Sequence, residues 1–100
     1  ALPLIAMGCD GVISVACNVF AQKNIEMIHL AQKGEIEEAA KLHLELLEAT
    51  ELLFAEGNPA GVKAALELKG ITKETLRLPL VRVSESLKEK IAQQIKKYNL

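Results

Sequence analysis

The sequence has 100 residues, half of them apolar, and its 12 basic and 13 acidic side chains nearly balance. A chain of this length buries roughly two-thirds of the surface that it exposes when unfolded, so we expect one soluble globular unit that needs no disulfides. Lys and Glu are interspersed, which excludes a basic patch for nucleic acid or an anionic membrane, and no apolar run is long enough to span a bilayer or to act as a signal peptide. We therefore expect a cytoplasmic protein with free thiols at Cys9 and Cys17.

The first elements are a short apolar helix and a buried strand. Residues 2–7 suit the tail of a helix, with Gly8 just past its end, and the start at Ala1 inside such a helix suggests that the chain is cut from a longer one. Residues 11–15 (GVISV) are β-branched and do not alternate, which is typical of a strand covered on both faces of a parallel sheet. Burying the unpaired backbone of a lone strand costs a few kcal/mol per group. We therefore expect partner strands outside this sequence.

Two helices follow the strand. The first runs from about residue 24 to 33 and ends at Gly34, and the second begins with an acidic first turn after Glu35. Apolar positions at three- and four-residue spacing predict the buried stripe of the second helix. This stripe comprises Ile36, Ala40, His43, Leu47, Thr50 and Phe54, and it is widened by Ala39, Leu46 and Leu53.

Two more helices and a linker complete the chain. Asn58 and Pro59 predict a helix start, with Asn58 as the cap, and Gly70 predicts the end of that helix. Residues 76–81 contain a central proline that cannot donate to a sheet, so we expect an extended surface linker. Ser84 is the expected cap of the last helix. The buried stripe of that helix is predicted to be Leu87, Ile91, Ile95 and Tyr98.

Few side chains suggest catalysis. The candidate metal ligands are Cys9, Cys17, His29 and His43. Their spacing matches no close-paired zinc pattern, so we expect no metal site. Cys17 follows the predicted strand, but a nucleophile needs a base beside it, and a small buried thiol is the preferred interpretation. Glu56 is expected to hold a neighbouring backbone rather than to act as an acid or base, and nothing marks Lys63 as a Schiff-base lysine.

Ile13 carries no reactive group, but its backbone is a candidate for ligand binding. Strand ends at the top of a parallel barrel leave main-chain groups unpaired, and these groups can face a bound ligand. This interpretation is allowed by the sequence and not required by it.

Four motifs at characteristic distances resemble the carboxyl-terminal third of the dihydrodipicolinate synthase family. In chain order they are GCDGVISVACNV, KGEIEEA, LFAEGNPAGVKAAL and LRLPL. The resemblance implies an α/β fold, namely the carboxyl-terminal fragment of a (β/α)8 barrel with an appended helical domain. Residues 1–34 would contain the end of barrel helix 7, strand 8 and helix 8, and residues 35–100 would form the helical domain.

The same resemblance implies an activity. Family members condense pyruvate, bound as a Schiff base to a lysine, with aspartate semialdehyde in lysine and diaminopimelate biosynthesis, without a cofactor and usually as cytoplasmic homotetramers. The lysine and the other catalytic residues belong to earlier strands, so no catalytic residue is expected in this segment. The only family position that maps here is Ile13, whose main chain would lie beside pyruvate.

The sequence departs from the family pattern at two positions and leaves two alternatives open. Cys9 stands where a second glycine is common, and Gly61 replaces a proline, which should loosen a helix start by up to about 1 kcal/mol. One alternative is a sibling lyase acting on N-acetylneuraminate or a 2-keto-3-deoxy sugar acid. The other is a non-catalytic helical interaction module in which residues 11–15 form a buried linker.

Overall fold

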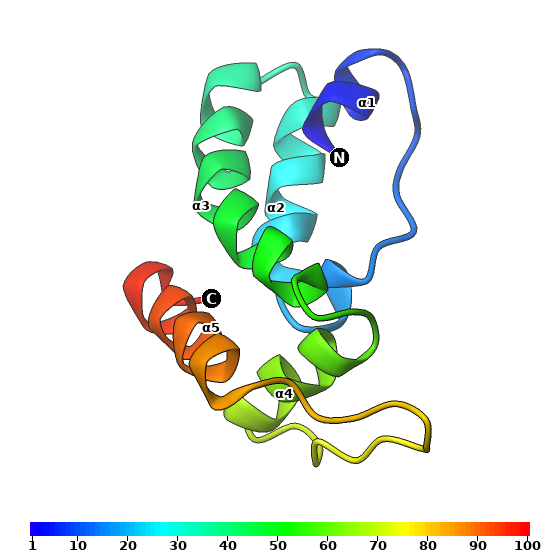
Figure 1. Cartoon of the computed structure of the whole chain (residues 1–100). Coiled ribbons are helices and arrows are strands. Elements are labelled where there is room, and N and C mark those ends of the chain that lie inside the picture. Colours follow the sequence, from blue (N-terminus) through cyan, green and yellow to red (C-terminus); the bar gives the residue numbers. More distant parts are fainter. The chain divides into compact units, whose positions relative to one another are not determined.

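The computed structural model describes residues 1–100 and is entirely helical (Figure 1). Its elements are α1 (Leu2–Ala6), the 3₁₀ turn η1 (Ala16–Asn18), α2 (Ala21–Gln32), α3 (Ile36–Phe54), α4 (Ala60–Leu68) and α5 (Glu85–Tyr98). The chain forms two compact units, Ala1–Leu47 and Glu48–Leu100. None of the helices has the length and apolar composition that crossing a bilayer requires.

The first unit is built around α2. Helix α1 and turn η1 both contact α2. Its core side chains come from all the elements of the unit. They are Leu2, Ile5, Ala16, Val19, Phe20, Met27, Ala31, Ala39 and Leu46. Gly34 has φ +83°, the left-handed conformation that suits the end of α2 and that glycine adopts without strain.

Residues 11–15 form no strand within this chain, whose predicted partner strands lie outside the sequence. These residues form an irregular connection from α1 to η1, visible as the long blue segment in Figure 1. Ile13 is fully exposed rather than buried, and Val12, Ser14 and Val15 are half-buried. The physical reason is that no other segment of the chain is extended beside them, so no ladder of hydrogen bonds can form.

The second unit packs α4 against α5. Its core contains small residues of α4 and larger apolar residues of the neighbouring segments. They are Ala49, Leu53, Ala60, Val62, Ala64, Ala65, Val83, Leu87 and Ile91. The linker at residues 76–81 has no regular structure and is mostly exposed, as predicted, and Ser84 Oγ accepts the backbone N–H of Leu87 at 3.2 Å as the predicted cap of α5. Ile95 and Tyr98 of the predicted stripe are half-buried.

The buried face of α3 differs from the predicted stripe. The buried line of α3 is Ala39, Leu46, Ala49 and Leu53, while Ile36, Leu47 and Phe54 are exposed. Periodicity identified a wide apolar face, but it could not locate its centre, which depends on what packs against it.

The start of α4 also differs. The cap position is Pro59, and Asn58 makes no side-chain cap. Two amides of the first turn bind backbone carbonyls instead: Gly61 N–H donates to Gly57 O at 3.2 Å and Lys63 N–H donates to Pro59 O at 3.0 Å. Gly61 is buried, and a Cβ at this position would lie 2.0 Å from Leu53 O. The absence of a side chain at Gly61 therefore permits close packing against the end of α3.

Candidate functional site

The segment that carries Ile13 is fixed at both ends and open in the middle. On its amino-terminal side, Gln32 Nε2 at the end of α2 donates to Asp10 O at 2.8 Å. On its carboxyl-terminal side, Ser14 Oγ accepts Cys17 N–H at 3.3 Å, and Asn18 Nδ2 donates to Val15 O at 3.1 Å. No residue from 11 to 13 hydrogen-bonds elsewhere in the chain. The exposed middle therefore has main-chain donors and acceptors available for an external partner.

The chemistry of this segment is limited to its main chain and thiols. Cys9 is exposed and Cys17 is half-buried, and both thiols are free, as predicted. His29 is exposed on α2 and His43 is half-buried on α3. The structure brings no group of three His, Cys, Asp or Glu side chains together in a way that could hold a metal ion.

Glu56 holds a neighbouring backbone, as the sequence predicted. Its Oε1 accepts the backbone N–H of Ser84 at 2.8 Å, and its Oε2 accepts the Ser84 hydroxyl at 2.5 Å. These two hydrogen bonds hold the pKa of the Glu56 carboxyl below its ordinary value, and the bond from the Ser84 hydroxyl has the larger effect. Because Ser84 also caps α5, Glu56 fixes the point where the linker enters that helix.

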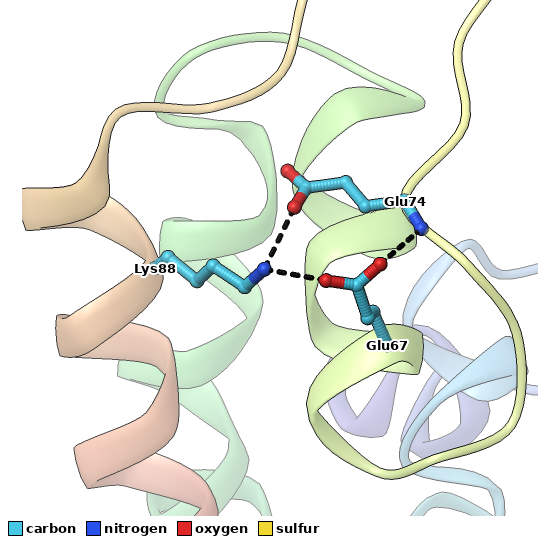
Figure 2. Close-up of polar contacts among 3 residues, drawn as sticks. All are labelled: Glu67, Glu74 and Lys88. Atoms are coloured by element: carbon cyan, nitrogen blue, oxygen red, sulfur yellow. Dashed lines mark hydrogen bonds and ion pairs between the residues drawn. The ribbon is translucent and has the colours of Figure 1, made fainter.

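A cluster of three charged residues, Glu67, Glu74 and Lys88, joins the linker to α4 and α5 (Figure 2). Lys88 Nζ lies 2.7 Å from Glu67 Oε1 and 2.8 Å from Glu74 Oε2, and Glu67 Oε2 accepts the backbone N–H of Glu74 at 2.6 Å. The Glu74 side chain is only 2% exposed, and its Oε1 has no hydrogen-bond partner. We call these three residues the Lys88 clasp.

The hydrogen bonds of the Lys88 clasp shift the pKa values of two of its members. Donation by Lys88 and by the Glu74 amide lowers the pKa of Glu67, and acceptance by Glu67 and Glu74 raises the pKa of Lys88. The charged forms of Glu67 and Lys88 are therefore favoured by their mutual contact. This arrangement fixes the linker and leaves no free base or nucleophile.

Lys63 is likewise engaged in structure. Its Nζ donates to Thr75 O at 2.6 Å, next to the Lys88 clasp on the linker. An ammonium group bound to a carbonyl in this way anchors the backbone, and it has no feature of a Schiff-base lysine. The linker is thus held on both sides, at Glu74 and Thr75 before it and at Ser84 after it.

Sequence reasoning missed the Lys88 clasp. Glu67 lies on α4, Glu74 in the irregular segment after it and Lys88 on α5, so no periodicity within a single element relates them. The only available signal was the single acidic residue Glu74 in a short polar turn, which predicts nothing without the fold.

The chain resembles solved and curated enzymes of one kind. It is 45% identical over 96 residues to the 4-hydroxy-tetrahydrodipicolinate synthase of Methanosarcina mazei, a match that covers 96% of this chain and 33% of the relative. It is 39% identical to the crystal structure of dihydrodipicolinate synthase from Aquifex aeolicus, with a TM-score of 0.90, covering 99% of this chain and 34% of that one. A third match is the chloride-inhibited dihydrodipicolinate synthase from Acinetobacter baumannii complexed with pyruvate, at 30% identity and a TM-score of 0.92, covering 99% of this chain and 34% of that one.

The fold of this chain is therefore similar to that of the corresponding third of longer enzymes. The chain spans about a third of the length of the relatives that it matches. A family profile, described as the dihydrodipicolinate synthetase family, matches residues 1–98, nearly the whole sequence. On this evidence the chain belongs to the dihydrodipicolinate synthetase family.

Proposed function

We propose that the chain forms part of a lyase that condenses pyruvate with aspartate semialdehyde in lysine and diaminopimelate biosynthesis. The observation that carries the proposal is the 45% identity over 96 residues to a 4-hydroxy-tetrahydrodipicolinate synthase. In this proposal the pyruvate is held as a Schiff base on a lysine outside these 100 residues. That placement agrees with the engagement of Lys63 and Lys88 in structural contacts.

The proposed contribution of this chain to the pocket is the main chain of Ile13, beside pyruvate. Three features support this role: Ile13 is fully exposed, residues 11–13 have no hydrogen bond within the chain, and the flanking carbonyls of Asp10 and Val15 are held in place. A backbone group on a fixed segment suits a small substrate, because it offers a defined polar contact without a flexible side chain.

The remaining organisation follows the same proposal. Residues 1–34 would form the end of a (β/α)8 barrel, in which residues 11–15 pair as the last strand with strands absent from this sequence. Residues 35–100 would form the appended helical domain. The enzyme would be a cytoplasmic homotetramer that uses no cofactor.

The proposal is tested on the full-length protein with purified substrates. Pyruvate together with aspartate semialdehyde should be consumed, and borohydride added with pyruvate should leave a covalent mass increase on one lysine peptide. Cleavage of N-acetylneuraminate or of a 2-keto-3-deoxy sugar acid instead would assign the protein to a sibling lyase. No turnover of any of these, combined with cooperative monomeric folding of the isolated 100 residues, would favour a helical interaction module.

The role of Ile13 needs a separate test. A structure of the full-length protein with bound pyruvate should place the Ile13 main chain in contact with the adduct. An adduct remote from Ile13 would remove this residue from the proposed pocket and leave the proposed reaction unchanged.

A further inference from the structure

Ile13 lies between two sets of side-chain hydrogen bonds that act on its flanking backbone. The amino-terminal set is the single bond from Gln32 Nε2 to Asp10 O at 2.8 Å. The carboxyl-terminal set consists of Cys17 N–H to Ser14 Oγ at 3.3 Å and Asn18 Nδ2 to Val15 O at 3.1 Å. The segment between them, which includes Gly11, makes no hydrogen bond of its own within the chain. Within these 100 residues, the flanking contacts alone hold this segment, and in the proposed barrel they act together with pairing to the neighbouring strands.

Both sets are attached to the buried part of the first unit. Gln32 is the last residue of α2, which is anchored by Met27 and Ala31 in the core. Ser14 lies shortly before the turn η1 and Asn18 is its last residue; Ala16 in the turn and Val19 directly after it are both buried. A side chain fixed to a packed element transmits that position to the backbone it binds. The side chains of Ser14, Asn18 and Gln32 thus connect the backbone around Ile13 to the core.

The geometry points to Ser14, Asn18 and Gln32 as positioning residues for the main chain of Ile13 at the pyruvate site. This inference rests on the proposed function. None of the three need touch the substrate, because each acts on a carbonyl or amide within four residues of Ile13 or on the neighbouring turn. Small displacements of a binding group cost affinity when the contact is short and directional. Loss of a positioning residue should therefore weaken pyruvate binding more than it slows the chemical steps.

Ser14 offers the sharpest substitution. Ser14→Ala removes the acceptor of the Cys17 amide, and Ser14→Thr keeps the hydroxyl. Since one hydrogen bond contributes about 0.5–1.5 kcal/mol, Ser14→Ala should raise the KM for pyruvate by roughly two- to twelvefold, with little change in kcat or in the KM for aspartate semialdehyde. Ser14→Thr should restore the wild-type KM. Ser86→Ala, at an exposed serine on α5, is the matched control and should change neither constant.

Gln32 and Asn18 supply independent variants. Gln32→Ala should raise the KM for pyruvate in the same way, whereas Gln22→Ala, at an exposed glutamine of the same helix, should not. Asn18→Asp keeps the shape of the side chain but removes the donor to Val15 O, and it should behave like Ser14→Ala. Should one variant fail to fold, the other two still test the inference.

Hydrogen exchange separates this inference from the proposed function. In the full-length protein without pyruvate, exchange at residues 11–15 should be faster in Ser14→Ala, Asn18→Asp and Gln32→Ala than in wild type, with the controls unchanged. A wild-type enzyme that turns over pyruvate while these variants keep its KM and its exchange rates would overturn the inference alone. A wild-type protein that does not use pyruvate would overturn the proposed function, whatever the exchange rates show.

Discussion

Replacing Lys88 by Met should destabilise the second unit, because it leaves a buried carboxylate without its counter-ion. Glu74 is 2% exposed and its Oε1 already lacks a partner, so the ammonium of Lys88 is its principal compensation. Breaking a buried ion pair by removing one member costs about 3–5 kcal/mol. The Lys88 and Glu67 side chains are 21% and 35% exposed, and solvent screening there reduces the expected loss to about 2–3 kcal/mol.

The measurement is urea unfolding of the full-length protein at neutral pH and fixed protein concentration, followed by circular dichroism. Lys90→Met is the matched control, because Lys90 is exposed on the same helix. In the double variant Lys88→Met, Glu74→Met the buried charge is gone, and much of the lost stability should return. A loss for Lys88→Met within about 0.5 kcal/mol of that for Lys90→Met would refute the assignment of Lys88 as the counter-ion of Glu74.

Three further predictions concern Glu67, Gly61 and the cap of α5. Hydrogen bonds lower the pKa of Glu67 below its ordinary value of 4.5. The stability that Glu67 contributes is therefore present above pH 4.5 and is lost as the pH falls through the folded-state pKa. Acid unfolding followed by circular dichroism should accordingly be less steep in Glu67→Gln than in wild type. Gly61→Ala should cost about 1–3 kcal/mol in urea unfolding because its Cβ would meet Leu53 O at 2.0 Å, whereas Gly11→Ala, with open space, should be nearly neutral; equal effects would contradict this packing. Ser84→Ala should lower stability by about 1 kcal/mol through loss of the helix cap, and Ser86→Ala should change the thermal midpoint little.

The helices were predictable because their determinants are local. Periodic apolar residues, the Ser84 cap and the glycines after helix ends act within a few residues, and they placed the helical segments close to where the structure has them. The structural role of Glu56 was predicted from its place beside a helix boundary, but its partner Ser84 lies 28 residues away and was not identified.

The remaining features depend on contacts that local patterns do not encode. The strand at residues 11–15 needs neighbours that this sequence does not contain, so strong β propensity alone produced an irregular segment. The close approach of Gly61 to Leu53 and the meeting of Glu67, Glu74 and Lys88 arise only when separate elements pack. In each case the residue type was visible in the sequence and its partner was not.

Polar contacts are used differently in the two units. In the second unit, charged side chains tie the linker down at both ends, through the Lys88 clasp and through Glu56 at Ser84. In the first unit, neutral side chains fix only the ends of the segment around Ile13 and leave its middle unpaired and exposed. A backbone segment held only at its ends keeps the main-chain donors and acceptors of its middle available for an external partner. The part of this chain best suited to ligand binding is therefore a stretch of main chain, whereas the carboxylates of Glu56, Glu67 and Glu74 hold the second unit together.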